Sequence, residues 1–271
     1  MQRMQKEMGT VNTGPITDIH SHILPYIDDG AKSIDVAVGM AKMALSEGIK
    51  RIIATPHFDP ETKNIQGFLH KRENGLNELR RKLERNQIDV EIIPGAEVYL
   101  VPGIAELDDL ELLCIGNTRY MLVEISFIEM PQWLDEILYK IQLRGITPIL
   151  AHPERSIKIS KEPQKLRPLV EKGVLLQLNA SSICDTPHRE LRKCTRYLIK
   201  SGMAHFIATD SHSLKSRPPK IQEALEIVAK DYGSDTVEYM LENARVLGDG
   251  GIVKTQPCVE YKPGIWERLF G

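Results

Sequence analysis

Histidine, aspartate and glutamate residues follow a series of short apolar segments in this sequence. The first two are His20 and His22, two residues apart in the run DIHSHILPYIDDG at 18–30. Because alternate residues of a strand point to the same face, these two imidazoles can bind one metal ion together. Residues of the same types follow later segments, namely His57, Glu97, Glu124, His152, Asp210 and His212, with Asp28 or Asp29 in the loop after His22.

This set of side chains predicts a metal centre. A single histidine at a strand end is more often a hydrogen-bonded structural residue, but so many ligand-type side chains in one place would be unfavourable without cations. Imidazole and carboxylate ligands with no cysteine nearby suit manganese, iron or zinc. Their number exceeds what one ion needs, so we expect two or three ions with a carboxylate bridge, an arrangement that activates water for displacement reactions.

The elements that must position these residues alternate between strand and helix. Apolar and β-branched runs predict strands at 16–23, 51–55, 90–98, 120–126, 146–151, 174–179 and 205–209. Helical periodicity predicts helices at 33–47, 66–86, 132–144, 161–172, 188–201, 218–230 and 235–244. This order is typical of a parallel sheet with crossover helices. We expect an α/β fold, a distorted (β/α)7 TIM-like barrel, with the metal site at the C-terminal ends of its strands.

Length and composition limit the class of protein. The 271 residues suit one domain, and we expect an N-terminal extension at 1–15, a barrel at 16–249 and a C-terminal tail at 250–271. The balance of 35 basic and 37 acidic residues gives no sign of a nucleic-acid partner. No apolar run is long enough to span a membrane, and the N-terminus has no secretory apolar segment, so we expect a cytoplasmic protein. A homo-oligomer is left open.

The motifs, taken in order, resemble the PHP (polymerase and histidinol phosphatase) superfamily. Within it, they resemble the CpsB/CapC/YwqE-type bacterial manganese-dependent protein-tyrosine phosphatases. The matching segments are DIHSHILPYIDDG at 18–30, ATPHF at 54–58, GAEVYL at 95–100, VEIS at 123–126, LAHPER at 150–155, LQLNASS at 176–182 and ATDSHS at 208–213. An HxH pair alone is weak, but this series covers most of the chain and is specific.

The resemblance implies a set of metal ligands. The first ion would be bound by His20, His22, Asp210 and a bridging Glu97; the second by Glu97, Glu124 and His152; the third by Asp29, His57 and His212. Asp28 is the alternative to Asp29 in that loop. The ions would be Mn2+ or iron, with Zn2+ or another divalent metal as alternatives.

Two arginines match positions that the family uses on phosphate. Arg155 ends the LAHPER segment, and Arg217 lies in the loop after the ATDSHS segment. A planar guanidinium can donate two parallel hydrogen bonds to phosphate oxygens. The alternative for both is a solvated surface charge. With Asp210, they are the residues expected to be catalytic.

The implied function is hydrolysis of phosphotyrosine on the tail of a bacterial tyrosine kinase that regulates capsular or exopolysaccharide synthesis. Metal-activated hydroxide would attack directly, with no phosphoenzyme. A thiol-based route needs an arginine six residues after a cysteine, and those positions hold Tyr120, Glu190, Lys200 and Gly264. The alternatives are another PHP phosphoesterase, such as a histidinol-phosphate or nucleotide phosphatase, a metal-dependent amidohydrolase, or a non-enzymatic regulator. The complete ligand set argues against the last.

Several aromatic residues lie in or near the motifs. We expect Phe127 and Trp133 to pack the start of a helix, with contact to substrate as the alternative. Tyr26 and Phe58 fit either plain packing or contact with an aromatic substrate at the mouth of the site. His205 lies outside the ligand set and is expected to have a structural or solvent-facing role.

Overall fold

The computed structural model describes residues 14–184 and 188–262. Its strands form two sheets, and every strand pair is parallel. The first sheet has the order β1 (Ile16–Ser21), β2 (Ile49–Ala54) and β4 (Glu91–Pro94). The second has the order β3 (His57–Phe58), β5 (Glu97–Tyr99), β6 (Tyr120–Glu124), β7 (Thr147–Ala151), β8 (Leu175–Asn179) and β9 (Phe206–Ala208). The predicted α/β class with parallel strands is confirmed.

Two segments differ from the predicted strands. The strand predicted at 51–55 stops at residue 54, and β3 begins at residue 57. The strand predicted at 90–98 is divided into β4 and β5. Pro56 and Pro94 have no N–H group to donate to a ladder. A Cβ on Gly95 would lie 3.1 Å from Ile53 Cγ2, so a larger residue at this bend would require the Ile53 side chain to shift. The division carries β3 and β5 into the second sheet, where His57 pairs with Glu97.

The segment after β9 also contacts β1. The N–H of Asp210 donates to the carbonyl of His20 at 2.9 Å, and the N–H of His22 donates to the carbonyl of Ser211 at 2.8 Å. Asp18 is a buried residue of β1, and its carboxylate accepts the N–H of Thr209 at 2.9 Å. These bonds bring the end of the last strand beside the end of the first.

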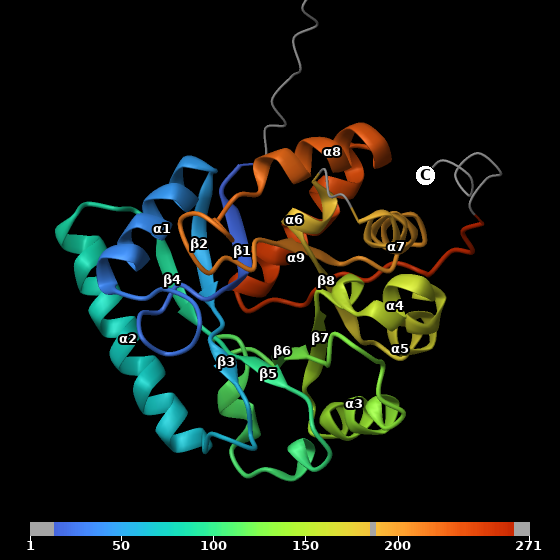
Figure 1. Cartoon of the computed structure of the whole chain (residues 1–271), viewed down its shortest axis with the longest axis horizontal. Helices are drawn as coiled ribbons and strands as arrows, with labels where there is room; N and C mark the ends of the chain where they lie inside the picture. The colour runs from blue at the N-terminus through green and yellow to red at the C-terminus, as the bar shows by residue number, and fades with distance from the viewer. Residues whose placement is uncertain (1–13, 185–187, 263–271) are drawn as a thin grey trace, which may run out of the picture.

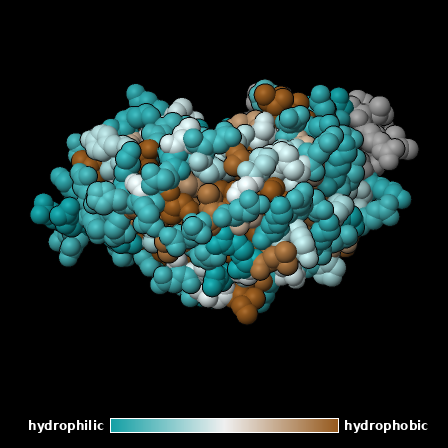
Figure 2. Space-filling view, turned by 90° about the horizontal axis from the view of Figure 1, so that it is seen from below, coloured by the Kyte–Doolittle hydropathy of each residue, from teal (hydrophilic) through white to brown (hydrophobic). Residues whose placement is uncertain are grey.

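Helices surround the strands. They are α1 (Ile34–Ser46), α2 (Ile65–Arg85), α3 (Leu134–Leu143), α4 (Ile157–Lys161), α5 (Arg167–Glu171), α6 (Ala180–Ile183), α7 (Arg189–Lys200), α8 (Gln222–Tyr232) and α9 (Ser234–Gly248). In Figure 1, α1 and α2 lie on one side of the molecule, and α4, α5 and α7 lie on the other. The face seen in Figure 2 is largely hydrophilic, with hydrophobic residues gathered toward its middle.

Local sequence explains where helices begin and break. α1 begins after Ser33, whose hydroxyl accepts the N–H of Val36 at 3.2 Å, as a helix N-cap does. The single helix predicted at 161–172 is wrong. The chain instead forms α4, a 3-10 helix at Pro163–Leu166 and α5. Pro163 begins the 3-10 helix and Pro168 is the second residue of α5, because a proline has no N–H to donate inside a continuous helix but is tolerated in its first turn.

The described part of the C-terminal tail lies along the body of the protein. The N–H of Val253 donates to the Tyr120 hydroxyl at 2.9 Å, and the N–H of Val259 donates to the carbonyl of Ser201 at 3.0 Å. The apolar ending from residue 265 lies outside the described residues. Within residues 14–184 and 188–262, every helix is too short or too polar to cross a membrane.

Candidate metal centre

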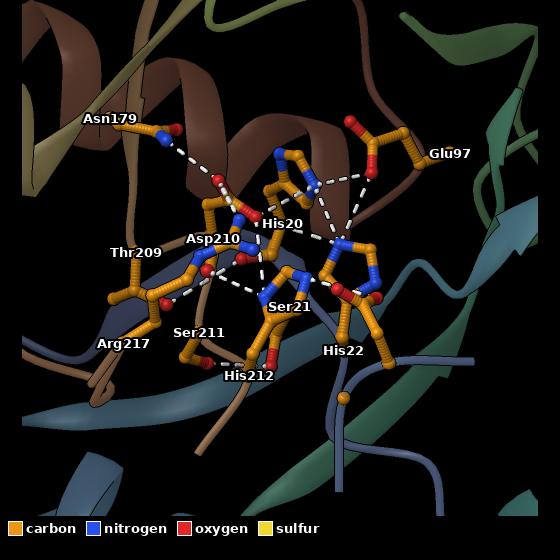
Figure 3. A network of polar contacts seen from close by, with 12 residues as sticks. His20, Ser21, His22, Glu97, Asn179, Thr209, Asp210, Ser211, His212 and Arg217 are labelled. Carbon is orange, nitrogen blue, oxygen red and sulfur yellow. Dashed lines mark hydrogen bonds and ion pairs between the residues drawn. The ribbon is translucent and has the colours of Figure 1, made fainter. Parts of the chain in front are cut away.

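All nine predicted ligand residues lie together: His57 and Glu97 begin β3 and β5, Asp29 lies in the loop after β1, and the other six lie at or just after the C-terminal end of a strand or in the last part of β1. Each belongs to a group of three or four side chains whose ligand atoms are within 4.8 Å of one another. The groups are His22, Asp29, His57 and His212; His20, His152 and Asp210; His20, His22 and Glu97; and His57, Glu97 and Glu124. Figure 3 shows the rings of His20 and His22 directed toward Glu97. The structure therefore brings the whole predicted set into one continuous cluster.

Glu97 is at the centre of this cluster. Its Oε2 lies 3.1 Å from His22 Nε2, 3.2 Å from His20 Nε2 and 3.0 Å from His57 Nδ1. Its Oε1 lies 2.9 Å from His152 Nε2. The residue is 1% exposed. A buried carboxylate with four imidazole neighbours has the position that a bridging ligand would need.

The electrostatics show that the cluster requires positive charge. Burial opposes ionisation of Glu97, yet His20 and the other nearby histidines hold the pKa of this carboxyl well below its usual range. Burial and the neighbouring Glu97 together raise the pKa of Glu124. Burial opposes protonation of His22, but hydrogen bonds to Asp28 and Glu97 outweigh it and raise its pKa to about 10. Protons on imidazole thus neutralise the same carboxylates that bound cations would.

Two buried polar atoms in the cluster support cation binding. Asp210 Oδ1 and His212 Nε2 have no hydrogen-bond partner among the described residues. Leaving such atoms buried and unsatisfied is unfavourable in a native fold. The donor set of imidazole and carboxylate matches manganese, iron or zinc. These residues therefore fit a group of divalent ions.

The loop after β1 gives different roles to Asp28 and Asp29. Asp28 Oδ2 lies 2.8 Å from His22 Nδ1 and accepts the N–H of His57 at 3.0 Å. Asp29 Oδ1 lies 3.5 Å from His57 Nε2 and 3.4 Å from His212 Nε2. Asp28 therefore orients the His22 ring through Nδ1, the nitrogen on the other side of the ring from Glu97, as a carboxylate commonly does for a metal-binding histidine. Asp29 instead faces the cluster.

Two hydrogen-bonded amide side chains lie on the other side of the cluster, beside His20 and Asp210. Gln177 Oε1 lies 3.0 Å from His20 Nδ1, and Gln177 Nε2 donates to Asn179 Oδ1 at 2.9 Å. Asn179 Nδ2 donates to Asp210 Oδ2 at 2.7 Å. No role was predicted for these two amides. Their spacing of two residues at the end of a predicted strand, which puts both on one face, is the signal that could have found them.

Both predicted arginines lie against Asp210. Arg155 Nη1 is 2.9 Å from Asp210 Oδ2, and Arg217 forms an ion pair with the same oxygen. Figure 3 shows Arg217 and Asn179 approaching Asp210 from the side away from Glu97. The two guanidinium side chains are 32% and 35% exposed, while Asp210 is buried. They are held at the edge of the cluster rather than extended into solvent.

The aromatic residues divide between the core and the edge of the site. The Phe127 ring lies 5.5 Å from the His152 ring, and the N–H of Ile157, the first residue of α4, donates to the Phe127 carbonyl at 2.8 Å. Trp133 packs against the core before α3, as predicted. Phe58 is buried, whereas Tyr26 is 68% exposed. Phe58 is thus a packing residue, and Tyr26 is open to solvent.

Fold and site together define an α/β protein with a cluster of histidines and carboxylates that could hold metal ions, edged by two arginines, beside the ends of parallel strands. A phosphotriesterase homology protein from Escherichia coli shares the fold, with a TM-score of 0.53 at 11% identity. A family model described as capsular polysaccharide synthesis, CpsB/CapC, matches residues 16–247. The chain belongs to the CpsB/CapC family.

Individual members of this family are similar along nearly their whole length. Tyrosine-protein phosphatase YwqE of Bacillus subtilis is 34% identical over 256 residues, which is 94% of this chain and 98% of YwqE. Tyrosine-protein phosphatase CpsB of Streptococcus pneumoniae is 30% identical over 84% of this chain and 96% of its own. A chain from the crystal structures of YwqE and CpsB, described as unique metal-dependent tyrosine phosphatases, has a TM-score of 0.84 and 32% identity; the match covers 92% of this chain and all of that one.

Proposed function

We propose that this chain is a metal-dependent tyrosine-protein phosphatase. The observation that carries the proposal is the pairing of a complete His/Asp/Glu cluster with two arginines on one of its carboxylates, Asp210. The names of YwqE and CpsB support tyrosyl phosphoproteins as substrates. The physiological substrate is phosphotyrosine on a bacterial tyrosine kinase that regulates capsular or exopolysaccharide synthesis, in keeping with the family description.

The fold that carries this activity is a distorted (β/α)7 barrel. Its ring counts β2 with β3, and β4 with β5, as two interrupted strands. The hydrogen bonds from Asp210 and His22 to the neighbouring strand end support closure between β9 and β1. This arrangement directs the side chains at the C-terminal ends of the strands toward one mouth.

The cluster accommodates two or three ions of manganese or iron. The sets implied by the family resemblance are His20, His22, Asp210 and Glu97 for one ion; Glu97, Glu124 and His152 for a second; and Asp29, His57 and His212 for a third. The structure groups the last set together with His22, but it places His152 with His20 and Asp210, and Glu124 with His57 and Glu97. Divalent ions supply Lewis-acid charge and lower the pKa of water, which makes hydrolysis feasible near neutral pH. Glu97 contacts members of each set, so its position supports the role of bridge.

Arg155 and Arg217 bind the phosphate. Both donate to Asp210 Oδ2 in the free protein, so their guanidinium groups already lie at the edge of the metal cluster. Phosphate oxygens entering this space would compete with that carboxylate oxygen for the same donors. Fixed guanidinium donors then stabilise the negative charge that develops on the equatorial oxygens during displacement.

The cysteines support direct hydrolysis rather than a thiol route. Burial raises the pKa of Cys114 to about 12 and that of Cys184 to about 11. Neither thiol ionises near neutral pH, and a thiolate is the reactive form. The metal ligands and the two arginines act by binding and positioning. No covalent phosphoenzyme is needed.

The test is hydrolysis of a phosphotyrosyl peptide by chelator-treated protein, with manganese, iron or zinc added back in separate reactions. A phosphoseryl peptide of the same sequence and histidinol phosphate serve as comparison substrates. We expect activity only after metal is restored. The phosphotyrosyl peptide should then be hydrolysed much faster than the phosphoseryl peptide or histidinol phosphate. Preferred cleavage of histidinol phosphate, or activity that survives metal removal, contradicts the proposal.

A further inference from the structure

Phe127 lies at the edge of the metal cluster with its ring partly open. The residue follows β6 by three positions, just beyond Glu124, and it is 41% exposed. Its ring centroid is 5.5 Å from the ring of His152. The next residue, Ile128, is 73% exposed. An aromatic ring therefore borders a cluster made of charged and polar groups.

The same ring supports an arginine of the phosphate site. Arg155 Cζ lies 4.8 Å from the centroid of Phe127, within the range of a cation–π contact. Arg155 thus has two fixed neighbours, the Phe127 ring and Asp210. The backbone also ties these segments together, because the N–H of Ile157 donates to the carbonyl of Phe127 at 2.8 Å. The ring and the guanidinium are held as one unit.

We infer that Phe127 is the residue that selects aryl phosphate esters at this site. A phosphate that contacts Arg155 also lies close to Phe127, because the guanidinium carbon is 4.8 Å from the centroid of that ring. An aromatic leaving group placed there comes within the roughly 4.5–7 Å centroid separation at which aromatic rings attract each other. An alkyl ester such as phosphoserine has no aromatic ring and cannot make this contact with Phe127.

This inference rests on the proposed function, because it concerns how the phosphatase tells phosphotyrosine from phosphoserine. It adds a specificity residue that lies outside the ligand set and both arginines. A purely supporting role for Phe127 is the competing explanation, since the ring also holds Arg155. The two explanations differ in one respect: loss of support weakens every phosphate ligand, whereas loss of the aromatic contact weakens only aryl ligands.

The test compares two inhibitors that differ by one ring. Benzylphosphonate and methylphosphonate both present a phosphonate to the arginines, and only the first presents an aromatic group. Their dissociation constants are measured calorimetrically on metal-loaded wild type, Phe127→Leu and Phe127→Tyr. Tyr139→Leu, an exposed aromatic on α3, is the control for loss of a surface ring. Circular dichroism verifies that each variant is folded.

We expect wild type to bind benzylphosphonate more tightly than methylphosphonate. Phe127→Leu should reduce that preference by about two- to tenfold, the usual size of an aromatic pair, while methylphosphonate binding changes little. Phe127→Tyr and Tyr139→Leu should keep the preference. An equal loss for both phosphonates in Phe127→Leu, or an unchanged preference, overturns the role of Phe127 while leaving the phosphatase intact. A wild type that hydrolyses no phosphotyrosyl peptide overturns the proposed function itself.

Discussion

Replacing Arg155 by alanine should remove phosphate binding without removing metal. Arg155 donates to Asp210 Oδ2 but belongs to none of the ligand groups. Asp210 keeps Arg217 and Asn179 as partners on the same oxygen. The variant should therefore keep its carboxylate in place and lose only the donors that a phosphate would meet.

The size of the effect follows from the bond that is lost. A hydrogen bond to a charged group contributes about 1.5–3 kcal/mol. Since each 1.36 kcal/mol is a factor of ten in rate, kcat/KM for a phosphotyrosyl peptide should fall about 10- to 150-fold. Arg217→Ala should act similarly. Because both arginines contact one oxygen of Asp210, the double variant should depart from the product of the two single effects.

The assay measures kcat/KM and bound metal on the same preparations. Arg245→Ala is the matched control, because Arg245 is a half-exposed arginine of α9 paired with Glu242 and Asp249. It should leave activity within a factor of two of wild type, since exposed ion pairs contribute little. If Arg155→Ala loses metal in proportion to activity, Arg155 helps to assemble the cluster and the phosphate assignment is refuted. Unchanged activity with normal metal content refutes it equally.

Three further predictions concern metal and proton binding. Glu97→Gln should abolish retention of metal and activity, because it removes the one carboxylate that contacts four histidines; metal analysis after gel filtration checks this. Gln177→Leu should weaken metal binding about 10- to 100-fold, as the loss of a hydrogen bond behind a ligand such as His20 typically does, measured by competition with a chelator. Burial lowers the pKa of His205 to about 4 from 6.5. The unfolded chain then takes up a proton that the native state does not, so stability is complete above pH 6.5 and falls by about 3 kcal/mol as the pH drops toward 4. His205→Asn should flatten this limb in chemical denaturation, and an unchanged limb would contradict the assignment.

Much of the site could be predicted because ligand types recur at strand ends. The spacing of His20 and His22 and the order of the later motifs predict the cluster, since parallel strands present their C-terminal ends at one edge. The choice between Asp28 and Asp29 could not be made from sequence. The two are adjacent, and their roles depend on how the loop turns back so that Asp28 reaches His22 Nδ1 at 2.8 Å. That turn depends on Gly30, where a Cβ would lie 2.1 Å from the carbonyl oxygen of His22.

The remaining differences come from contacts between distant segments. Periodicity alone extended the second strand through 55, but Pro56 interrupts its ladder and β3 pairs instead with β5. The position of Phe127 could not be deduced from its neighbours in sequence, because its ring is placed by His152 and Arg155, which follow the next strand. The periodicity of a strand determines which of its residues face the same side. The loops between strands determine which of those residues come into contact.

Asp210 shows why the metal and phosphate sites depend on each other. Its Oδ1 lies 3.5 Å from the Nε2 atoms of both His20 and His22 and has no hydrogen-bond partner within residues 14–184 and 188–262, whereas its Oδ2 contacts Arg155 and Asn179. One oxygen is thus free to bind a cation, and the other orients the donors that would bind an anion. A cation on Oδ1 would withdraw charge from Oδ2 and loosen its hold on the arginines. Metal loading would then make those donors more available to phosphate, so phosphate affinity should rise with metal content in a single preparation.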